Sequence, residues 1–330
     1  MALRTLEPDD LTAVRALAQR LEGEHDVGAA ELEAWCAPMP GRISLGAFEG
    51  ERLLGAASLF ASDRPRLRHA GHVELIAHPD EAPGLLRALR DLARDWWNLD
   101  RLDVVLPFDS ELQPAAQRAD MDLEIVRKRA FERRGELVDS VGYAWVRPGG
   151  AASTTEREFP RRNRSPLPDA FAIRETRADD APGFAAVLAD PGVCWATLQT
   201  PFGSVAAWRK RLAGNDPLRN ASFVGVVGEE IVATCGLHGA LSSRRQHVWS
   251  LGMSVRSDWQ GRGVGERLMA WLMREAEARQ VARVELDVFT DNTRAVALYE
   301  KFGFVSEGVQ RLEAFREGAY ADGRVMAKLR

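Results

Sequence analysis

A single stretch of the chain leads from an apolar strand into a helix: Leu251-Gly252-Met253-Ser254-Val255-Arg256-Ser257-Asp258-Trp259-Gln260-Gly261-Arg262-Gly263-Val264-Gly265. Its last three glycines fall where the predicted helix begins. Without side chains there, the backbone can approach a ligand closely. Consecutive N–H groups and the positive end of the helix then converge on an anion such as pyrophosphate. The stretch therefore predicts a phosphate cradle between a strand and a helix.

The residues around this stretch alternate between strand and helix patterns. Residues 226–237 read as two strands joined by a Gly-containing turn, whereas strand 247–255 reaches strand 282–289 through a helix. The pattern predicts an α/β fold whose twisted sheet is mixed, mostly antiparallel and flanked by helices. The expected elements are strand 171–174, helices 179–189 and 204–213, strands 222–227, 230–238 and 247–255, helix 263–280, strand 282–289, helix 292–301, and strands 304–311 and 323–329.

The chain also repeats itself. Residues 3–10 and 173–180 both read as a strand followed by a capped helix, and residues 48–57 and 226–235 both read as a hairpin. Near the ends of the two copies, three residues recur at the same spacing: Arg133, Gly135 and Asp139, then Arg316, Gly318 and Asp322. At 330 residues the chain also exceeds the usual size of one core. We expect two tandem domains, over 1–150 and 169–330, joined by a linker over 151–168 that contains Ser153, Pro160, Ser165, Pro166 and Pro168 and follows Gly149-Gly150.

Two motifs in the second copy resemble a known family. The pattern Gln260-x-x-Gly263-x-Gly265 is similar to the acetyl-CoA signature of the GCN5-related N-acetyltransferase (GNAT) family, and residues 292–304 resemble its other signature, with Asn292 and Tyr299 on one helix. The resemblance covers essentially all of 169–330. It implies that acetyl-CoA binds at the cradle through Gln260, Gly261, Arg262, Gly263, Val264 and Gly265. It also implies that the backbones of Met253 and Val255 bind the pantetheine arm.

Amine acetylation requires a proton for the departing thiolate. Asn292, Ala295 and Tyr299 share a helix face by their spacing, and by resemblance Tyr299 is the general acid, with Asn292 beside it. The alternative for Tyr299 is a structural ring that packs beside Phe302 and hydrogen-bonds locally. The general base is left open among His238, His247, Asp287 and Glu313, each of which could relay a proton through water. Loss of the amine proton to water alone is the further alternative.

The first copy lacks both motifs. At the cradle position it reads His78-Pro79-Asp80-Glu81-Ala82-Pro83-Gly84. Two prolines lack an N–H for phosphate, and two adjacent carboxylates would repel it. The later helix contains Pro114 and no Tyr. We therefore expect 1–150 to be a degenerate GNAT-like domain without a phosphate cradle, a layout similar to tandem members of the family.

Composition narrows the function classes. The net charge of −4 gives no general reason to bind nucleic acid, and three cysteines at 36, 194 and 235 form no C-x-x-C pair that would indicate a structural metal. Charged residues occur within the first ten, so no signal peptide is expected, nor any membrane span. We expect a cytoplasmic protein without a metal, either a monomer or a homodimer.

The leading hypothesis is an N-acetyltransferase that moves acetyl from acetyl-CoA to a primary amine of a small molecule. Arg209, Lys210 and Arg211 lie on the expected substrate side and suit an acceptor with a carboxylate, such as an amino acid. An exposed, functionless helix face is the alternative for these cations. The rival hypothesis for the whole chain is a non-catalytic, regulatory protein that binds acetyl-CoA.

Overall fold

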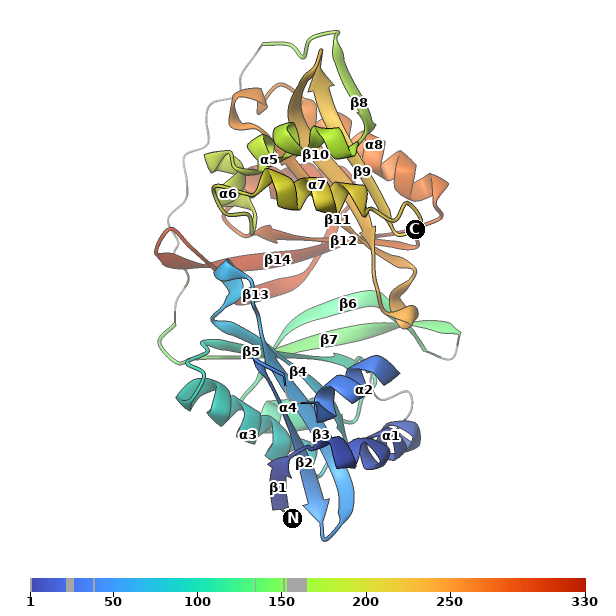
Figure 1. Ribbon diagram of the computed structural model, residues 1–330, viewed down its shortest axis with the longest axis vertical. Helices are drawn as coiled ribbons and strands as arrows, with labels where there is room; N and C mark the ends of the chain where they lie inside the picture. Colours follow the sequence, from blue (N-terminus) through green and yellow to red (C-terminus); the bar gives the residue numbers. More distant parts are fainter. Residues whose placement is uncertain (1, 22–26, 38, 134, 151, 153–164) are drawn as a thin grey trace. The chain divides into compact units, whose positions relative to one another are not determined.

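The computed structural model describes residues 2–21, 27–37, 39–133, 135–150, 152 and 165–330. They form a mixed α/β structure, drawn in Figure 1, that divides into two compact units. The first unit comprises Met1–Ser153 and Glu307–Gly323, and the second comprises Thr154–Ser306 and Arg324–Arg330. No helix within the described ranges is long and apolar enough to cross a membrane.

The elements of the second half follow the predicted order. Every expected strand and helix of 171–329 is present, and the closing strands are longer than expected. The additional helix is α6, whose six residues are too few for an apolar period to be visible. The elements are β8 (Phe171–Glu175), α5 (Ala181–Leu188), α6 (Pro191–Ala196), α7 (Val205–Ala213), β9 (Asn220–Val227), β10 (Glu230–Gly239), β11 (Val248–Val255), α8 (Val264–Ala278), β12 (Arg283–Phe289), α9 (Thr293–Lys301), β13 (Val305–Arg316) and β14 (Ala319–Leu329).

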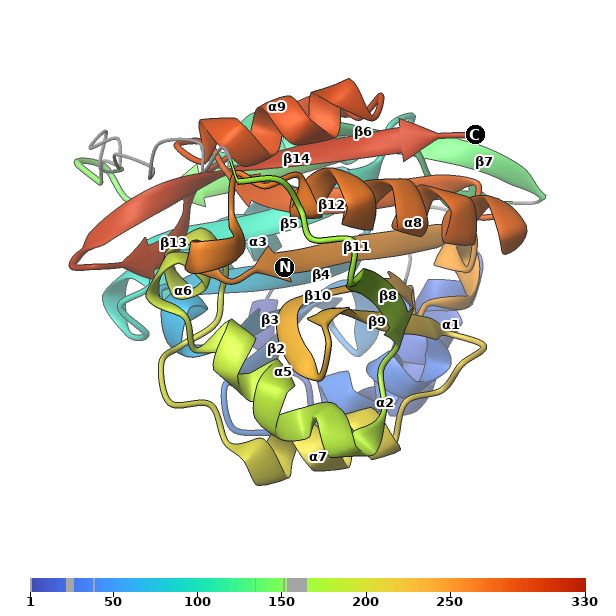
Figure 2. The ribbon, with the colours of Figure 1, turned by 90° about the horizontal axis from the view of Figure 1, so that it is seen from above.

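In the second unit the strand order is β14-β12-β11-β10-β9-β8. The β8–β9–β10–β11 pairings are antiparallel, and β11 pairs with β12 in parallel. Figure 2 shows α8 and α9 on one side of these strands and α5 and α7 on the other. The main core lies under α8 and α9, where Leu268 and Tyr299 meet Leu251 and Leu286. The opposite face of β11 and β12 is the more polar one.

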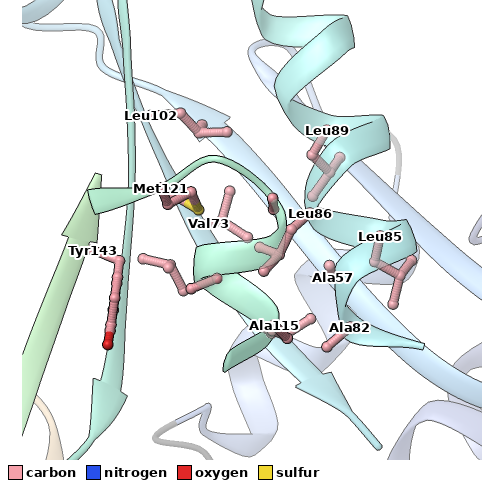
Figure 3. Packing of buried hydrophobic residues seen from close by; sticks show 14 of the residues in the cluster. Ala57, Val73, Ala82, Leu85, Leu86, Leu89, Leu102, Ala115, Met121 and Tyr143 are labelled. Carbon is pink, nitrogen blue, oxygen red and sulfur yellow. The ribbon is translucent and has the colours of Figure 1, made fainter. Parts of the chain in front are cut away.

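The first half has the same succession of elements, except that two α-helices rather than three lie between its first two strands. They are β1 (Ala2–Thr5), α1 (Leu11–Arg20), α2 (Ala29–Cys36), β2 (Arg42–Glu49), β3 (Arg52–Ala61), β4 (Ala70–Ala77), α3 (Ala82–Asp95), β5 (Arg101–Pro107), α4 (Gln113–Arg118), β6 (Asp122–Arg133) and β7 (Glu136–Val146). Their sheet runs β1-β2-β3-β4-β5-β7-β6-β13, with β4 and β5 parallel. One core packs α3 and α4 against this sheet, with Leu86, Val73 and Met121 among its members (Figure 3). A second, smaller core lies under α1 and α2.

Local contacts repeat between the two halves. The Arg4 guanidinium donates two hydrogen bonds to Asp10, at 2.7 Å each, and Arg174 does the same to Asp180 at 2.7 and 2.8 Å. In both halves the carboxylate also accepts a backbone N–H three residues earlier, which fixes the start of the first helix. The sequence repeat is therefore also a structural repeat.

The closing hairpins repeat a bulge. Arg129 and Leu312 both adopt a left-handed backbone, with φ of 51° and 50°. Each donates its N–H at 2.8 Å to an aspartate ten residues later, Asp139 and Asp322 respectively. The carboxylate thus satisfies the N–H that the bulge removes from the strand ladder.

The predicted extent of the second domain differs from the division of the structure into two compact units. The sequence predicts a continuous second domain over 169–330, whereas residues 307–323 group with the first unit. Most of the predicted linker, 151 and 153–164, lies outside the described residues. The boundaries at 150 and 169 therefore stay a prediction.

A buried charge network explains why part of β13 belongs to the first unit. Glu124 of β6 accepts hydrogen bonds from Arg101 Nη1 at 2.9 Å and from Arg311 Nε at 2.5 Å, and Arg101 Nη1 also donates to the Arg311 carbonyl at 2.7 Å. The side chains of Arg101 and Glu124 are each only 4% exposed. No local pattern reveals this network, since its members are up to 210 residues apart.

We expect Glu124→Gln to lower the free energy of unfolding by about 3–5 kcal/mol, because the buried Arg101 then keeps only the carboxylate of Asp103, whose Oδ1 lies 3.8 Å from its Nε. Urea denaturation followed by circular dichroism measures the change. Glu132→Gln, at an exposed position on the same strand, is the control and should change stability by less than about 0.5 kcal/mol. Equal losses in the two variants would show that the network does not hold this part of the sheet.

Candidate active site

Strands β11 and β12 separate after a short parallel pairing. Their register comprises three pairs and ends with Ser250 and Glu285, although β11 continues to Val255 and β12 to Phe289. On its other side β11 stays paired with β10 as far as Val255. One edge of β11 is therefore open where the strand approaches α8.

The open edge presents backbone hydrogen-bonding groups. The N–H of Arg256 donates to the Val232 carbonyl of β10 at 3.0 Å. Because neighbouring residues of a strand direct their backbone groups to opposite sides, those of Met253 and Val255 point away from β10, toward the opening. The side chain of Gln260 donates to the Val255 carbonyl at 2.9 Å, which secures the following loop to the strand. This is the orientation that the predicted pantetheine contacts require.

The glycines at the start of α8 form an open turn. Gly261 and Gly263 have φ of 78° and 90°, a left-handed conformation that favours glycine. Gly263 is the N-cap of α8 and supplies no side-chain cap, so the N–H groups of the first turn have no side-chain partner at this cap. A Cβ added at Gly263 would meet no atom within 4 Å.

Arg262 adds a positive charge to this turn. Its guanidinium lies 4.8 Å from the centre of the Trp259 ring, and its Nε is buried without a hydrogen-bond partner. An uncapped helix start beside an unsatisfied guanidinium nitrogen fits the diphosphate of a CoA-type ligand. Unlike Gly263, Gly265 has no open space beside it. A Cβ added at Gly265 would lie 3.2 Å from Leu298 Cδ2 and 3.4 Å from Met253 Cε.

A second loop holds the cradle in place, and the sequence-based prediction missed it. Asp190 caps α6 through Gly192 N at 2.9 Å and also accepts hydrogen bonds from Ser257, from its N–H at 3.2 Å and from its hydroxyl at 2.5 Å. A Cβ at Gly192 would lie 2.4 Å from Ser257 Oγ. The Asp190-Pro191-Gly192 sequence is a recognisable helix start, but its partner is 67 residues away.

Helix α9 places Asn292 and Tyr299. Asn292 is the N-cap, with its side-chain oxygen accepting the Ala295 N–H at 3.3 Å. Tyr299 is 8% exposed, and its ring centre lies 6.0 Å from that of Phe304. Its hydroxyl makes no hydrogen bond with the described residues, so the local bond of the alternative interpretation is not formed. Burial raises the pKa of Tyr299 to about 12, which keeps the phenol protonated at neutral pH.

Three of the candidate bases, His247, Asp287 and Glu313, lie in different places. Asp287 is on β12 just beyond its last pair with β11, two residues after Glu285 and so on the same face. His247 precedes β11, about 16 Å along the strand from Gly252 at the usual rise per residue. Glu313 is on β13, among the residues that group with the first unit. Of the three, Asp287 therefore lies at the opening.

Small residues line the polar face beside the opening. Gly252 is exposed and pairs with Gly236 of β10, and a Cβ added at Gly252 would meet no atom within 4 Å. His238, two residues along from Gly236, is in contact with Asn220 through a 3.0 Å hydrogen bond. Desolvation and the charge of Arg211 hold the pKa of His238 below its usual range. The sequence-based prediction did not identify these two glycines, because strand glycines also mark bulges.

No group of three metal-ligating side chains occurs within the described residues.

Comparisons with known proteins find one family model and several similar proteins. The acetyltransferase (GNAT) family model matches residues 184–304. The chain is 33% identical over 161 residues to the L-amino acid N-acetyltransferase AaaT of Escherichia coli (strain K12), covering 48% of this chain and 98% of that protein. It is 35% identical over 75 residues to the [ribosomal protein bS18]-alanine N-acetyltransferase of Salmonella typhimurium, covering 23% of this chain and 51% of that protein. A crystal structure of a GNAT acetyltransferase from Streptococcus pneumoniae is similar with a TM-score of 0.44 and 24% identity, over 48% of this chain and 98% of that one.

The chain belongs to the GNAT family and is an acetyltransferase. The predicted family resemblance and enzyme class are thereby confirmed. At 330 residues the chain is about twice as long as its matched relative, as tandem domains would require. The roles of the individual site residues stay predictions.

We expect Gly263→Asp to abolish CoA binding in the full-length protein, because a carboxylate would enter the anion site and the left-handed backbone would be strained. Isothermal titration calorimetry with CoA measures the loss. Gly228→Asp is the matched control, since Gly228 also has a positive φ of 61° and open space but lies in the β9–β10 turn. Retained CoA affinity in Gly263→Asp would show that the anion binds elsewhere.

Proposed function

We propose that the second unit transfers an acetyl group from acetyl-CoA to the primary amine of a small molecule, an amino acid in particular. The observation that carries this proposal is the open edge of β11, which leads directly into the uncapped start of α8. Membership of the acetyltransferase family supports the reaction class. The printed name of the 33% identical relative, an L-amino acid N-acetyltransferase, supports the acceptor class.

The cradle residues bind the donor in this proposal. Backbone N–H groups of 263–266 and the Arg262 guanidinium hold the diphosphate, and the backbones of Met253 and Val255 pair with the amides of the pantetheine arm. The donor supplies the activated acetyl thioester. A backbone N–H near Met253 is placed to polarise the thioester carbonyl.

Tyr299 supplies the proton in this proposal. Its hydroxyl is protonated at neutral pH and is not bonded to another described side chain, so it can donate to the sulfur as the thiolate leaves. Asn292 acts through the helix, because its cap orients the first turn of the element that carries Tyr299. A tyrosine with a pKa of about 12 remains a donor throughout the neutral and mildly alkaline range.

The acceptor approaches from the polar face in this proposal. The open floor at Gly252 leaves room for a substrate, and Asp287 beside it is the favoured base, acting directly or through water. Arg211 is the member of the 209–211 cluster whose charge reaches this face, as its effect on His238 indicates. We assign to Arg211 the carboxylate of the acceptor.

The first unit carries no transferase site in this proposal. The N–H groups of Glu81 and Ala82 already bond to the His78 carbonyl, at 3.1 and 3.2 Å, in the turn that precedes α3. Pro83 then occupies the first turn of that helix. A diphosphate would therefore not find the N–H groups of Glu81 and Ala82 free.

We expect Tyr299→Phe to retain acetyl-CoA binding but to lower kcat by about 10- to 1000-fold, the range for loss of one general acid. The rate of CoA release at saturating substrate gives kcat, and isothermal titration calorimetry gives the affinity for acetyl-CoA. Tyr143→Phe, a buried tyrosine of the first unit, is the matched control and should keep the wild-type rate. In the wild-type enzyme, ionisation of Tyr299 should cause no fall in rate between pH 8 and 10, since the proton is lost only near pH 12. An unchanged kcat in Tyr299→Phe would remove this residue from the mechanism.

We expect free amino acids to be acetylated in preference to Lys-rich peptides when both compete for labelled acetyl-CoA. Arg211→Gln should raise KM for amino acids by about tenfold with little change for amines that lack a carboxylate. Arg209→Gln, an exposed neighbour on α7, is the control. Preferential acetylation of the peptides would overturn the acceptor class. Binding of acetyl-CoA without release of CoA from any amine would favour the regulatory alternative.

A further inference from the structure

A line of four side chains crosses the sheet of the first unit. Arg42 of β2 pairs in register with Phe60 of β3, Phe60 with His72 of β4, and His72 with Asp103 of β5. Residues directly opposite each other in a sheet point to the same face. All four therefore lie on the face opposite the core that contains Leu59.

The four side chains also contact one another in sequence. The Arg42 guanidinium lies 5.2 Å from the centre of the Phe60 ring, and the Phe60 and His72 ring centres are 5.2 Å apart in an edge-to-face arrangement. Nδ1 of His72 is 2.6 Å from Asp103 Oδ2. The side chains of His72 and Asp103 are 33% and 26% exposed, so solvent and small ligands reach the pair.

Arg42 is the unsatisfied member of the line. Its Nε and Nη1 are buried without a hydrogen-bond partner, and no carboxylate of the described residues forms an ion pair with it. The acid on the neighbouring row, Glu74, instead accepts a hydrogen bond from Trp35 Nε1 at 2.8 Å. Arg42 as a whole is half-buried, but two of its guanidinium nitrogens are covered without a partner, which is costly, and an anionic ligand at this guanidinium would offset that cost.

His72 is poised as a second donor. Its Nδ1 contacts Asp103, and its Nε2 makes no hydrogen bond with the described residues. Desolvation alone would lower the pKa of His72, and Arg127 also lowers it, but the charge and hydrogen bond of Asp103 and the charge of Glu74 outweigh them and raise it. The imidazole therefore carries its positive charge to higher pH than an ordinary histidine.

The corresponding line in the second unit has different chemistry. Its register runs Asn220, His238, Ser250 and Glu285, at the same positions of β9, β10, β11 and β12. It contains no arginine and no histidine–carboxylate contact between neighbouring strands. The charged line is thus specific to the first unit, which has no phosphate cradle.

We propose that this face of the first unit binds a small carboxylic acid, with its carboxylate on Arg42, its carbon skeleton on Phe60 and a second hydrogen-bond acceptor on Nε2 of His72. Succinate and N-acetylglycine have this pattern of groups, whereas glycine and methylamine do not. The site would bind without chemistry, because no donor site adjoins it.

The test is a titration of the full-length protein labelled with ¹⁵N-histidine, observed by NMR. The chain has six histidines, and His72→Gln identifies the His72 signals. Succinate and N-acetylglycine should shift the His72 signals saturably, and glycine and methylamine should not. Ligands that enter the second unit instead shift other histidines, so the outcome does not depend on the proposed transferase reaction.

Substitutions separate the two donors. Arg42→Gln should weaken binding by about 10- to 100-fold, as expected for loss of a charged hydrogen bond. Arg52→Gln, an exposed arginine at the start of β3, is the matched control and should bind as wild type. Asp103→Asn should lower the pKa of His72 and weaken binding at pH 7 more than at pH 5.5.

Inorganic phosphate that competes equally well would show that only an anion is required and would overturn the carboxylic-acid assignment. Absence of any saturable His72 shift, or unchanged binding in Arg42→Gln with the fold intact, would overturn the site itself.

Discussion

The early end of the pairing between β11 and β12 is the constraint on which the candidate active site depends. Backbone groups that lose a sheet partner must find another one, and those of Met253 and Val255 lose theirs after Ser250 and Glu285 separate. Gln260 satisfies one carbonyl, and the remaining groups suit the amides of an extended ligand. The glycine turn at the start of α8 follows the end of β11. The proposed donor binding would therefore depend on where the sheet opens rather than on any single side chain.

The same opening occurs in the first unit without the same consequence. Strands β4 and β5 pair over four residues, ending with Val73 and Val104, and then continue to Ala77 and Pro107. The two copies therefore share the sheet geometry and differ in the turn that follows it. In the first copy the His78 carbonyl takes the N–H groups that a phosphate would need. On the prediction that the first unit lacks a phosphate cradle, this local change alone would account for the difference while the sheet stays the same.

Local chemistry made much of this structure predictable from the sequence. Glycines at a helix start, hairpin turns and a helical Asn-to-Tyr spacing act within about ten residues, and they gave the element order, the cradle and the helix that carries Tyr299. The rest depends on register between distant strands. The contact of Asp190 with Ser257, the Arg101–Glu124–Arg311 network and the position of Asp287 at the opening all arise this way. A one-residue change of register would move each of these side chains to the other face, and no local pattern records it.

The polar faces of the two units show what the duplication allowed to diverge. In the second unit, Ser250 and Gly252 occupy the positions that His72 and Glu74 hold in the first. Small residues leave an open floor for a substrate that must reach a reactive group, since any bulk there would hold the amine away from the thioester. Charged and aromatic residues fill the same floor in the first unit, and the proposed carboxylic acid would gain its affinity from those side chains. One sheet face cannot be both open and filled, so the proposed reaction and the proposed recognition of a carboxylic acid would each need their own copy of the fold.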